Sequence, residues 1–110
     1  MTESQSQARR LSARFAEDVA SYLQSQGVNV KPGVEQTGSL VGLDNWHLRL
    51  SRSYRIKLSE HLPEAQATAK EQGKPFSCVV QYRSGAALAD QYCVMTLETL
   101  SGILKALEGI

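Results

Sequence analysis

The sequence predicts a mixed α/β (α+β) domain with the element order α-β-β-β-α-β-β-α. Two observations support this prediction. Segments near both ends and in the middle of the chain repeat apolar residues every three or four positions, which is typical of helices with one buried face. Shorter segments between them alternate apolar and polar residues or are apolar throughout, as strands are. We expect a single domain over residues 8–110.

The first helix is expected from about Ala8 to Gln26. Its apolar residues recur every four positions, and Gly27 is a natural stop signal. The stripe consists of Leu11, Phe15, Val19 and Leu23, widened by Tyr22. Residues 1–7 are polar, and we expect them to form a frayed terminus.

Three short segments with strand character follow, at residues 28–30, 39–43 and 46–52. Pro32-Gly33 and Asp44-Asn45 supply turns between them, so we expect a small antiparallel meander. In the third segment apolar and polar residues alternate strictly, which predicts one buried face and one polar face.

A second helix is expected over residues 59–72, closed by Gly73. Pro63 must then lie in its first turn, where a missing N–H costs little. Residues 76–82 are almost wholly apolar, as in a strand that is covered on both faces, and residues 92–95 form a further strand.

The last helix is expected to begin near Thr96, which is a good N-cap residue. Its apolar stripe consists of Leu97, Leu100, Leu104 and Leu107. Gly102 lies inside this helix, where glycine costs about 1 kcal/mol relative to alanine, so we expect close packing at that position.

Composition and charge indicate a globular chain, with 42% hydrophobic and 21% charged residues. The net charge is only +1, so a nucleic-acid site would have to depend on local clustering. No apolar run approaches the roughly 18–20 residues that cross a bilayer, and the N-terminus lacks the apolar core of a signal peptide. We therefore expect a cytoplasmic protein without a membrane partner.

The two cysteines, Cys78 and Cys93, each lie in an apolar strand-like run. In a reducing cytoplasm we expect two small buried side chains. Two cysteines and two histidines without close spacing make a poor zinc site, so we expect no metal and no other cofactor.

A basic segment begins in the third strand and carries four positive charges and no negative one. These charges are Arg49, Arg52, Arg55 and Lys57, and Arg83 follows the fourth strand. One interpretation is an exposed face that keeps the chain soluble. The other is a site for an anion such as a nucleic-acid backbone, to which His47 would add charge below its pKa.

Four phrases along the chain, in order, carry a resemblance to a known family. They are ARRLSARFAEDVASYL, GSLVGLDNWHLRL, LPEAQATAKEQGKPFSCVVQYRSG and YCVMTLETLSGIL. From about Arg9 to Leu107 the chain resembles small phage-type Holliday junction resolvase-like nucleases of the PD-(D/E)XK, restriction-endonuclease-like superfamily. The resemblance implies a small restriction-endonuclease-like fold with a mixed central sheet flanked by helices, a phage or prophage origin and a two-fold homodimer.

The resemblance also assigns catalytic positions. In that family an aspartate on the second strand binds a divalent metal, and an acid-x-lysine step on the third strand completes the site. Ser39 stands in place of the aspartate, Arg49 in place of the acid and Ser51 in place of the lysine, whereas the first-helix glutamate is kept as Glu17. Mg²⁺ prefers carboxylate ligands, and a guanidinium stays charged at any ordinary pH. The resemblance therefore implies a nuclease scaffold without a catalytic metal and without nuclease activity.

A relocated metal site remains an alternative, built from Glu17 with Glu35 or Asp44. Glu35 is expected to end the first strand, from which it could lean towards the former site, whereas Asp44 is more typical of a turn.

Two functions follow as hypotheses. The first is a catalytically inactive member of this family that binds branched or duplex DNA through Arg49, Arg52, Arg55, Lys57 and Arg83. The alternative is a protein-interaction module, an inhibitor or adaptor of a host or phage protein. In the resembled family the segment after the fourth strand is rich in lysine and arginine, and here Arg83 alone remains, which favours the alternative.

Overall fold

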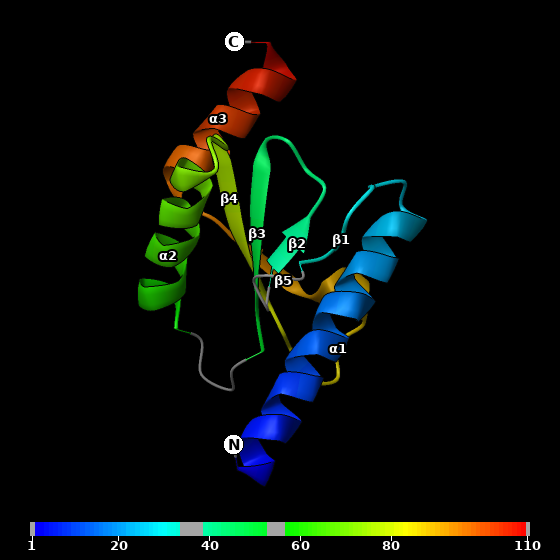
Figure 1. The fold of residues 1–110 in the computed structure, drawn as a ribbon. Coiled ribbons are helices and arrows are strands. Elements are labelled where there is room, and N and C mark those ends of the chain that lie inside the picture. Colours follow the sequence, from blue (N-terminus) through cyan, green and yellow to red (C-terminus); the bar gives the residue numbers. More distant parts are fainter. Residues whose placement is uncertain (1, 34–38, 53–56, 110) are drawn as a thin grey trace.

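The structure, a computed structural model, describes residues 2–33, 39–52 and 57–109. Within these ranges three α-helices and five strands follow one another in the predicted order (Figure 1). A short 3-10 helix, η1 (Leu88–Asp90), lies between the last two strands and was not expected from the sequence. The α+β fold class is therefore confirmed.

The sheet contains all five described strands in the spatial order β1-β2-β3-β4-β5. The strands are β1 (Lys31–Pro32), β2 (Ser39–Val41), β3 (Trp46–Ser51), β4 (Phe76–Gln81) and β5 (Tyr92–Val94). Strands β3 and β4 run parallel, and the other neighbouring pairs are antiparallel. The predicted meander and the mixed sheet are both confirmed.

The first strand lies later in the chain than predicted. Residues 28–30 are not a strand, because Val30 turns into the core, where it is 2% exposed. Its carbonyl oxygen accepts a hydrogen bond from Gln24 Nε2 at 2.7 Å. Pairing with β2 begins only at Lys31, opposite Val41.

Helix α1 (Glu3–Ser25) starts five residues before the predicted position. Thr2 is its N-cap: Thr2 Oγ1 accepts from the Gln5 N–H at 3.2 Å, and Gln5 Oε1 accepts from the Thr2 N–H at 3.0 Å. This reciprocal capping box satisfies two N–H groups at the helix start. The prediction of a frayed segment 1–7 is therefore wrong for residues 3–7, whereas Gly27, with φ of +86°, ends the helix as predicted.

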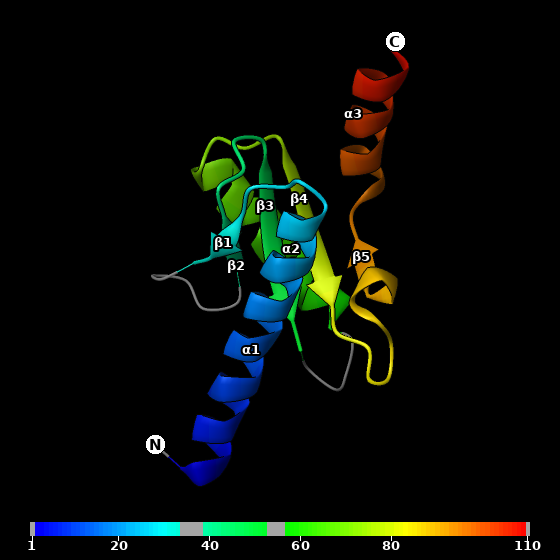
Figure 2. The same cartoon turned by 90° about the vertical axis from the view of Figure 1, so that its right-hand side faces the viewer.

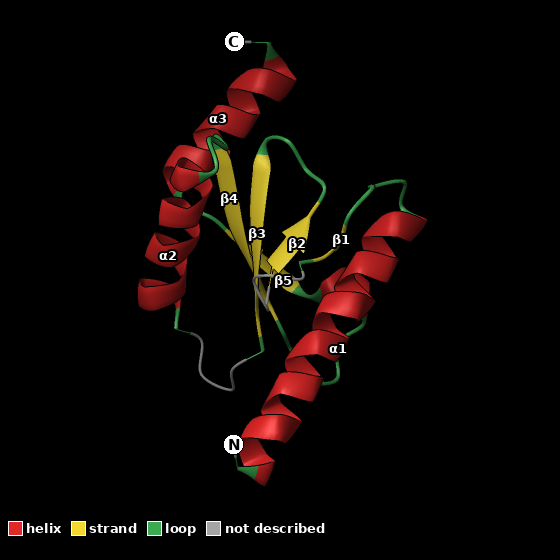
Figure 3. Cartoon of the chain, viewed as in Figure 1, coloured by secondary structure: helices red, strands yellow, loops and turns green. Residues whose placement is uncertain are grey.

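Helices α1 and α2 (Leu58–Glu71) cover opposite faces of the sheet (Figures 2 and 3). The main apolar core lies between α1 and the sheet. It consists of Phe15, Ala16, Val19, Ala20, Val30, Leu40, Leu50, Cys78 and Val80. Strand β4 is buried from Ser77 to Gln81, as predicted for a strand that is covered on both faces.

On the other face, α2 approaches the sheet through two small residues, Ala65 and Ala69, which are 0% and 4% exposed. The helix begins at Leu58, so Pro63 is its sixth residue. The prediction that Pro63 lies in the first turn is therefore wrong. The position is tolerated because the exposed Pro63 ring lies on the outer side of the helix, at the expense of one backbone hydrogen bond.

Helix α3 (Leu97–Glu108) has the predicted N-cap, since Thr96 Oγ1 accepts from the Thr99 N–H at 3.2 Å. It contacts β4 through Thr99, which is buried, and through Gly102. A Cβ atom at position 102 would lie 2.8 Å from Phe76 Cε1, so the predicted close packing is confirmed. The rest of α3 extends away from the sheet (Figure 2).

Candidate functional site

The positions that the resemblance assigns to catalysis lie together on the α2 face of the sheet. Ser39 on β2 is the direct cross-strand partner of Arg49 on β3, and Ser51 lies two residues further along the same face. Ser39 and Ser51 are 6% and 4% exposed. The fourth position, Glu17, is exposed on α1, which covers the opposite face. The structure thus brings three of the four positions together and separates Glu17 from them.

Arg49 is bound within the chain. Its Nη2 atom lies 2.8 Å from Oε2 of Glu64 on α2, and the two side chains are 35% and 55% exposed. An ion pair this open to solvent contributes about 0.2–1 kcal/mol to stability. Glu64 was not predicted as a site residue, because nothing in the sequence indicates that this turn of α2 docks beside position 49. The carboxylate neutralises the charge that we expected to be available to DNA.

His47 shares this face and is 5% exposed. Burial lowers its pKa, and the positive charges of Lys74 and Arg49 lower it further. His47 is therefore neutral under ordinary conditions and adds no positive charge to an anion site. The polar face of β3 was expected to be exposed, but α2 covers it.

The remaining predicted DNA-binding cations lie elsewhere. The Arg52 guanidinium stacks over the Tyr82 ring at 4.2 Å, and the Arg83 guanidinium stacks over the Tyr92 ring at 3.9 Å. Arg83 also donates to the Asp90 carbonyl oxygen at 2.9 Å. Lys57 is the exposed N-cap of α2, without a side-chain cap hydrogen bond. Two of the residues considered in the sequence, Arg55 and Glu35, lie outside the described residues.

A small hollow of about 220 Å³ adjoins Arg52 and Tyr82 at the end of the sheet. Arg14 and Asp18 of α1 line it together with Leu11 and Phe15. The parallel pairing of β3 and β4 explains the location: the Tyr82 N–H donates to the Ser51 carbonyl oxygen at 2.8 Å, so residues that follow the two strands meet at one edge. We call this region the carboxyl edge. Arg14 was not among the predicted contacts.

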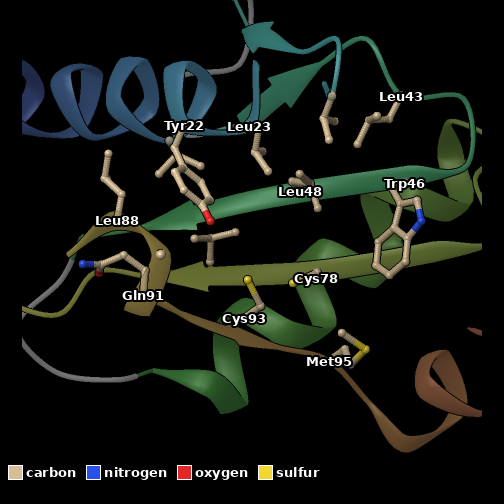
Figure 4. A pocket seen from close by; sticks show the side chains of 14 residues that line it. Tyr22, Leu23, Leu43, Trp46, Leu48, Cys78, Leu88, Gln91, Cys93 and Met95 are labelled. Atoms are coloured by element: carbon tan, nitrogen blue, oxygen red, sulfur yellow. The ribbon is translucent and has the colours of Figure 1, made fainter. Parts of the chain in front are cut away.

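A larger apolar hollow of about 460 Å³ lies between α1, the sheet and the segment around η1 (Figure 4). Its lining includes Tyr22, Leu23, Leu48, Cys78, Cys93 and Met95. The sequence gives no signal for it, because its lining residues have the pattern of an ordinary core.

The stripe of α3 is uncovered, which the sequence did not indicate. Its exposed fractions are 79% for Leu97, 39% for Leu100, 45% for Leu104 and 78% for Leu107. We call these four residues the α3 leucine stripe. The helix rests on the body through Thr99 and Gly102, so the leucines, on a different side of the helix, face solvent.

In residues 2–33, 39–52 and 57–109, no three His, Cys, Asp or Glu side chains lie close enough together to hold a metal ion. No helix in these ranges is both long and apolar enough to span a bilayer. Comparisons of the chain with protein-family models, with curated proteins and with solved structures find no match.

Proposed function

We propose that this chain is a non-catalytic protein-binding module, and that its α3 leucine stripe binds the same stripe of a second copy. The observation that carries the proposal is the exposure of four leucines on one short helix, with Leu97 and Leu107 nearly 80% exposed. Soluble proteins rarely leave such a contiguous apolar surface open unless it binds something.

The spacing of the stripe favours a helix as the partner. Positions 97, 100, 104 and 107 follow the alternating three- and four-residue spacing of paired helices, in which leucine side chains of one helix fill the gaps of the other. Helices that lie on lipid are usually rich in Lys and Arg on the polar face. Helix α3 carries Lys105 against Glu98 and Glu108, which favours a protein partner over an anionic membrane.

A second copy is the occupant best matched to this surface. A two-fold contact brings the same patch of both copies together, and a leucine stripe is complementary to another leucine stripe. The net charge of +1 imposes little repulsion between copies.

The non-catalytic part of the proposal is supported by the α2 face. Two serines and an arginine occupy the positions that the resemblance assigns to a metal aspartate, an acid and a lysine. The carboxylate of Glu64, which lies beside these positions, is paired with Arg49. A divalent ion placed beside Arg49 would be repelled by its guanidinium.

Sedimentation equilibrium of the intact chain tests the proposal. We expect a monomer–dimer equilibrium with a dissociation constant on the order of 10 μM, because a 12-residue helix offers a small interface. The substitution Leu104→Glu places a charge in the stripe and should weaken the dimer roughly 30-fold.

Leu11→Glu on α1 is the matched control, because Leu11 is 37% exposed and lies outside the stripe. It should leave the dimer intact. A chain that remains monomeric well above the expected dissociation constant, or a dimer equally weakened by both substitutions, would rule out the stripe as the interface.

A second candidate function is binding of a nucleic-acid backbone, now at the carboxyl edge. The observation that favours it is that Arg14 and Arg52 line one hollow beside the Tyr82 ring, an arrangement of cations and an aromatic face that suits a phosphate backbone. Asp18 in the same hollow reduces the positive charge, which places this candidate second.

Binding of a fluorescent branched DNA at several salt concentrations tests this candidate. Contacts of Arg14 and Arg52 to two phosphates predict a slope of log affinity against log salt of roughly −1.8. Replacing Arg14 and Arg52 together by Gln should remove two phosphate contacts and make the slope shallower by roughly 1.8. The control Lys105→Gln on α3 should leave the slope unchanged. Affinity that is independent of salt would exclude the candidate.

A further inference from the structure

The two cysteines lie close together and differ in access to solvent. Strands β4 and β5 pair antiparallel, and Val80 lies directly opposite Cys93. Cys78 is two residues before Val80, so the Cys78 and Cys93 side chains lie on the same face of the sheet. Both are free thiols that line the apolar hollow, and Figure 4 shows their side chains directed toward one another. The prediction of two buried thiols is confirmed for Cys78, which is 3% exposed, and is wrong for Cys93, which is exposed because it lies on the edge strand β5.

We infer that Cys93 and Cys78 form a reversible thiol–disulfide pair that reacts with small apolar disulfides entering the hollow. Cys93 is the attacking residue because it is accessible, and Cys78 is the resolving residue because it lies behind Cys93 and is shielded from solvent. A substrate with apolar substituents fits because the hollow, at about 460 Å³, is lined almost entirely by apolar side chains.

The ionisation of the two thiols agrees with these roles. A hydrogen bond from Cys78 lowers the pKa of Cys93 to about 7, although burial opposes this shift. The lowered pKa increases the share of Cys93 that is thiolate near pH 7, and the thiolate is the reactive form. The hydrogen bond to Cys93, together with burial, raises the pKa of Cys78, so Cys78 stays protonated while Cys93 is free.

The reaction proceeds in two exchanges. The Cys93 thiolate attacks one sulfur of the small disulfide, whose S–S bond breaks, so that one thiolate leaves and a mixed disulfide forms on Cys93. Cys78 then gives up its proton and attacks the Cys93 sulfur, which expels the second thiolate. The two cysteines lose two electrons and two protons, and the small disulfide is reduced to two thiols.

The resulting disulfide would be strained and therefore easily reduced. Diagonal neighbours on antiparallel strands have Cα atoms about 7–8 Å apart, whereas disulfides span about 4.4–6.8 Å. Closure therefore requires a small shift of β5, which is an edge strand with only three paired residues. Since two residues, Met95 and Thr96, separate β5 from α3, closure also changes the segment that carries the α3 leucine stripe.

The test uses the intact reduced chain and 2,2′-dithiodipyridine, an apolar disulfide that releases a coloured thione at each exchange. We expect two thiones per chain and a protein two hydrogens lighter, without an adduct. Cys78→Ala should release one thione and retain a mixed disulfide. Cys93→Ser should slow the first exchange roughly tenfold at pH 7, because the remaining thiol is buried and protonated.

The wild-type mass alone decides the central point and does not depend on the folding of a variant. A chain that carries one or two pyridyl adducts without closing would overturn the pairing of the two thiols. Equal first-exchange rates for Cys93→Ser and Cys78→Ala would overturn the assignment of roles. Oxidised glutathione, a charged disulfide, should react more slowly with the wild type than the apolar reagent, and a faster reaction would overturn the preference for apolar substrates.

Discussion

Arg49 and Arg52 are three residues apart in the sequence, yet they have different surroundings in the fold. Arg49 faces α2 and pairs with Glu64, whereas Arg52 lines a hollow with α1 residues and stacks on Tyr82. Successive side chains of a strand alternate between the two faces of the sheet. Arg49 and Arg52, just past the end of β3, are an odd number of positions apart, so the sheet lies between their side chains. A run of positive charges in the sequence is therefore not one positive surface in the molecule.

The alternation in β3 could be predicted, and the covering of its polar face could not. Period-2 spacing correctly assigned Leu48 and Leu50 to one side and Arg49 to the other. Which face a helix then covers depends on small residues of α2, Ala65 and Ala69, which permit close approach. Their spacing predicts a buried helix side without specifying what that side contacts.

His47 provides a prediction at this scale. Its pKa is lowered in the folded chain, first by burial and then by Lys74 and Arg49, so the unfolded chain binds a proton at a higher pH than the folded chain does. The contribution of His47 to stability should therefore be fully present above the unfolded pKa of about 6.5 and be lost as the pH decreases below it. The slope is at most about 1.4 kcal/mol per pH unit for one proton.

Urea denaturation between pH 5 and 8 measures this slope. His47→Gln should reduce the slope of stability against pH just below pH 6.5. The control His61→Gln, which replaces the other histidine of the chain, should retain the wild-type slope there. A wild-type stability that rises on acidification through this range would contradict the assignment.

At the scale of elements, periodicity predicted the helices and strands well and their ends less well. Helix α1 starts earlier than predicted because Thr2 and Gln5 form a capping box upstream of the apolar repeat. Strand β1 was misplaced because its extent depends on pairing with β2 and not on its own alternation. Both errors arise where contacts made by polar groups, and not apolar spacing, determine the boundary.

Helix α3 shows the limit of spacing as a predictor. A repeat of three and four residues describes a helix that is packed on a core and a helix that pairs with a partner equally well. The structure distinguishes the two cases, since the contact of Gly102 with Phe76 identifies the side of α3 that packs on the body. The leucines occupy another side of the helix and remain exposed.

At the scale of the whole molecule, three surfaces are formed by different sets of residues. The carboxyl edge collects Arg14, Arg52 and Tyr82, and the apolar hollow contains the two thiols. Helix α3, which carries the leucine stripe, extends away from the sheet (Figure 2). None of these surfaces coincides with the α2 face that the resemblance assigns to catalysis. The positions of interest for binding are thus distinct from Ser39, Arg49 and Ser51.

Calorimetric titration of the intact chain with Mn²⁺ most directly tests whether this protein binds instead of cutting. Because Arg49 and its ion pair with Glu64 occupy the face where a metal would be held, we predict no saturable binding. A one-to-one isotherm that disappears on Glu17→Gln or Glu64→Gln would show that carboxylates of this chain do hold a divalent ion, and would contradict a purely non-catalytic role.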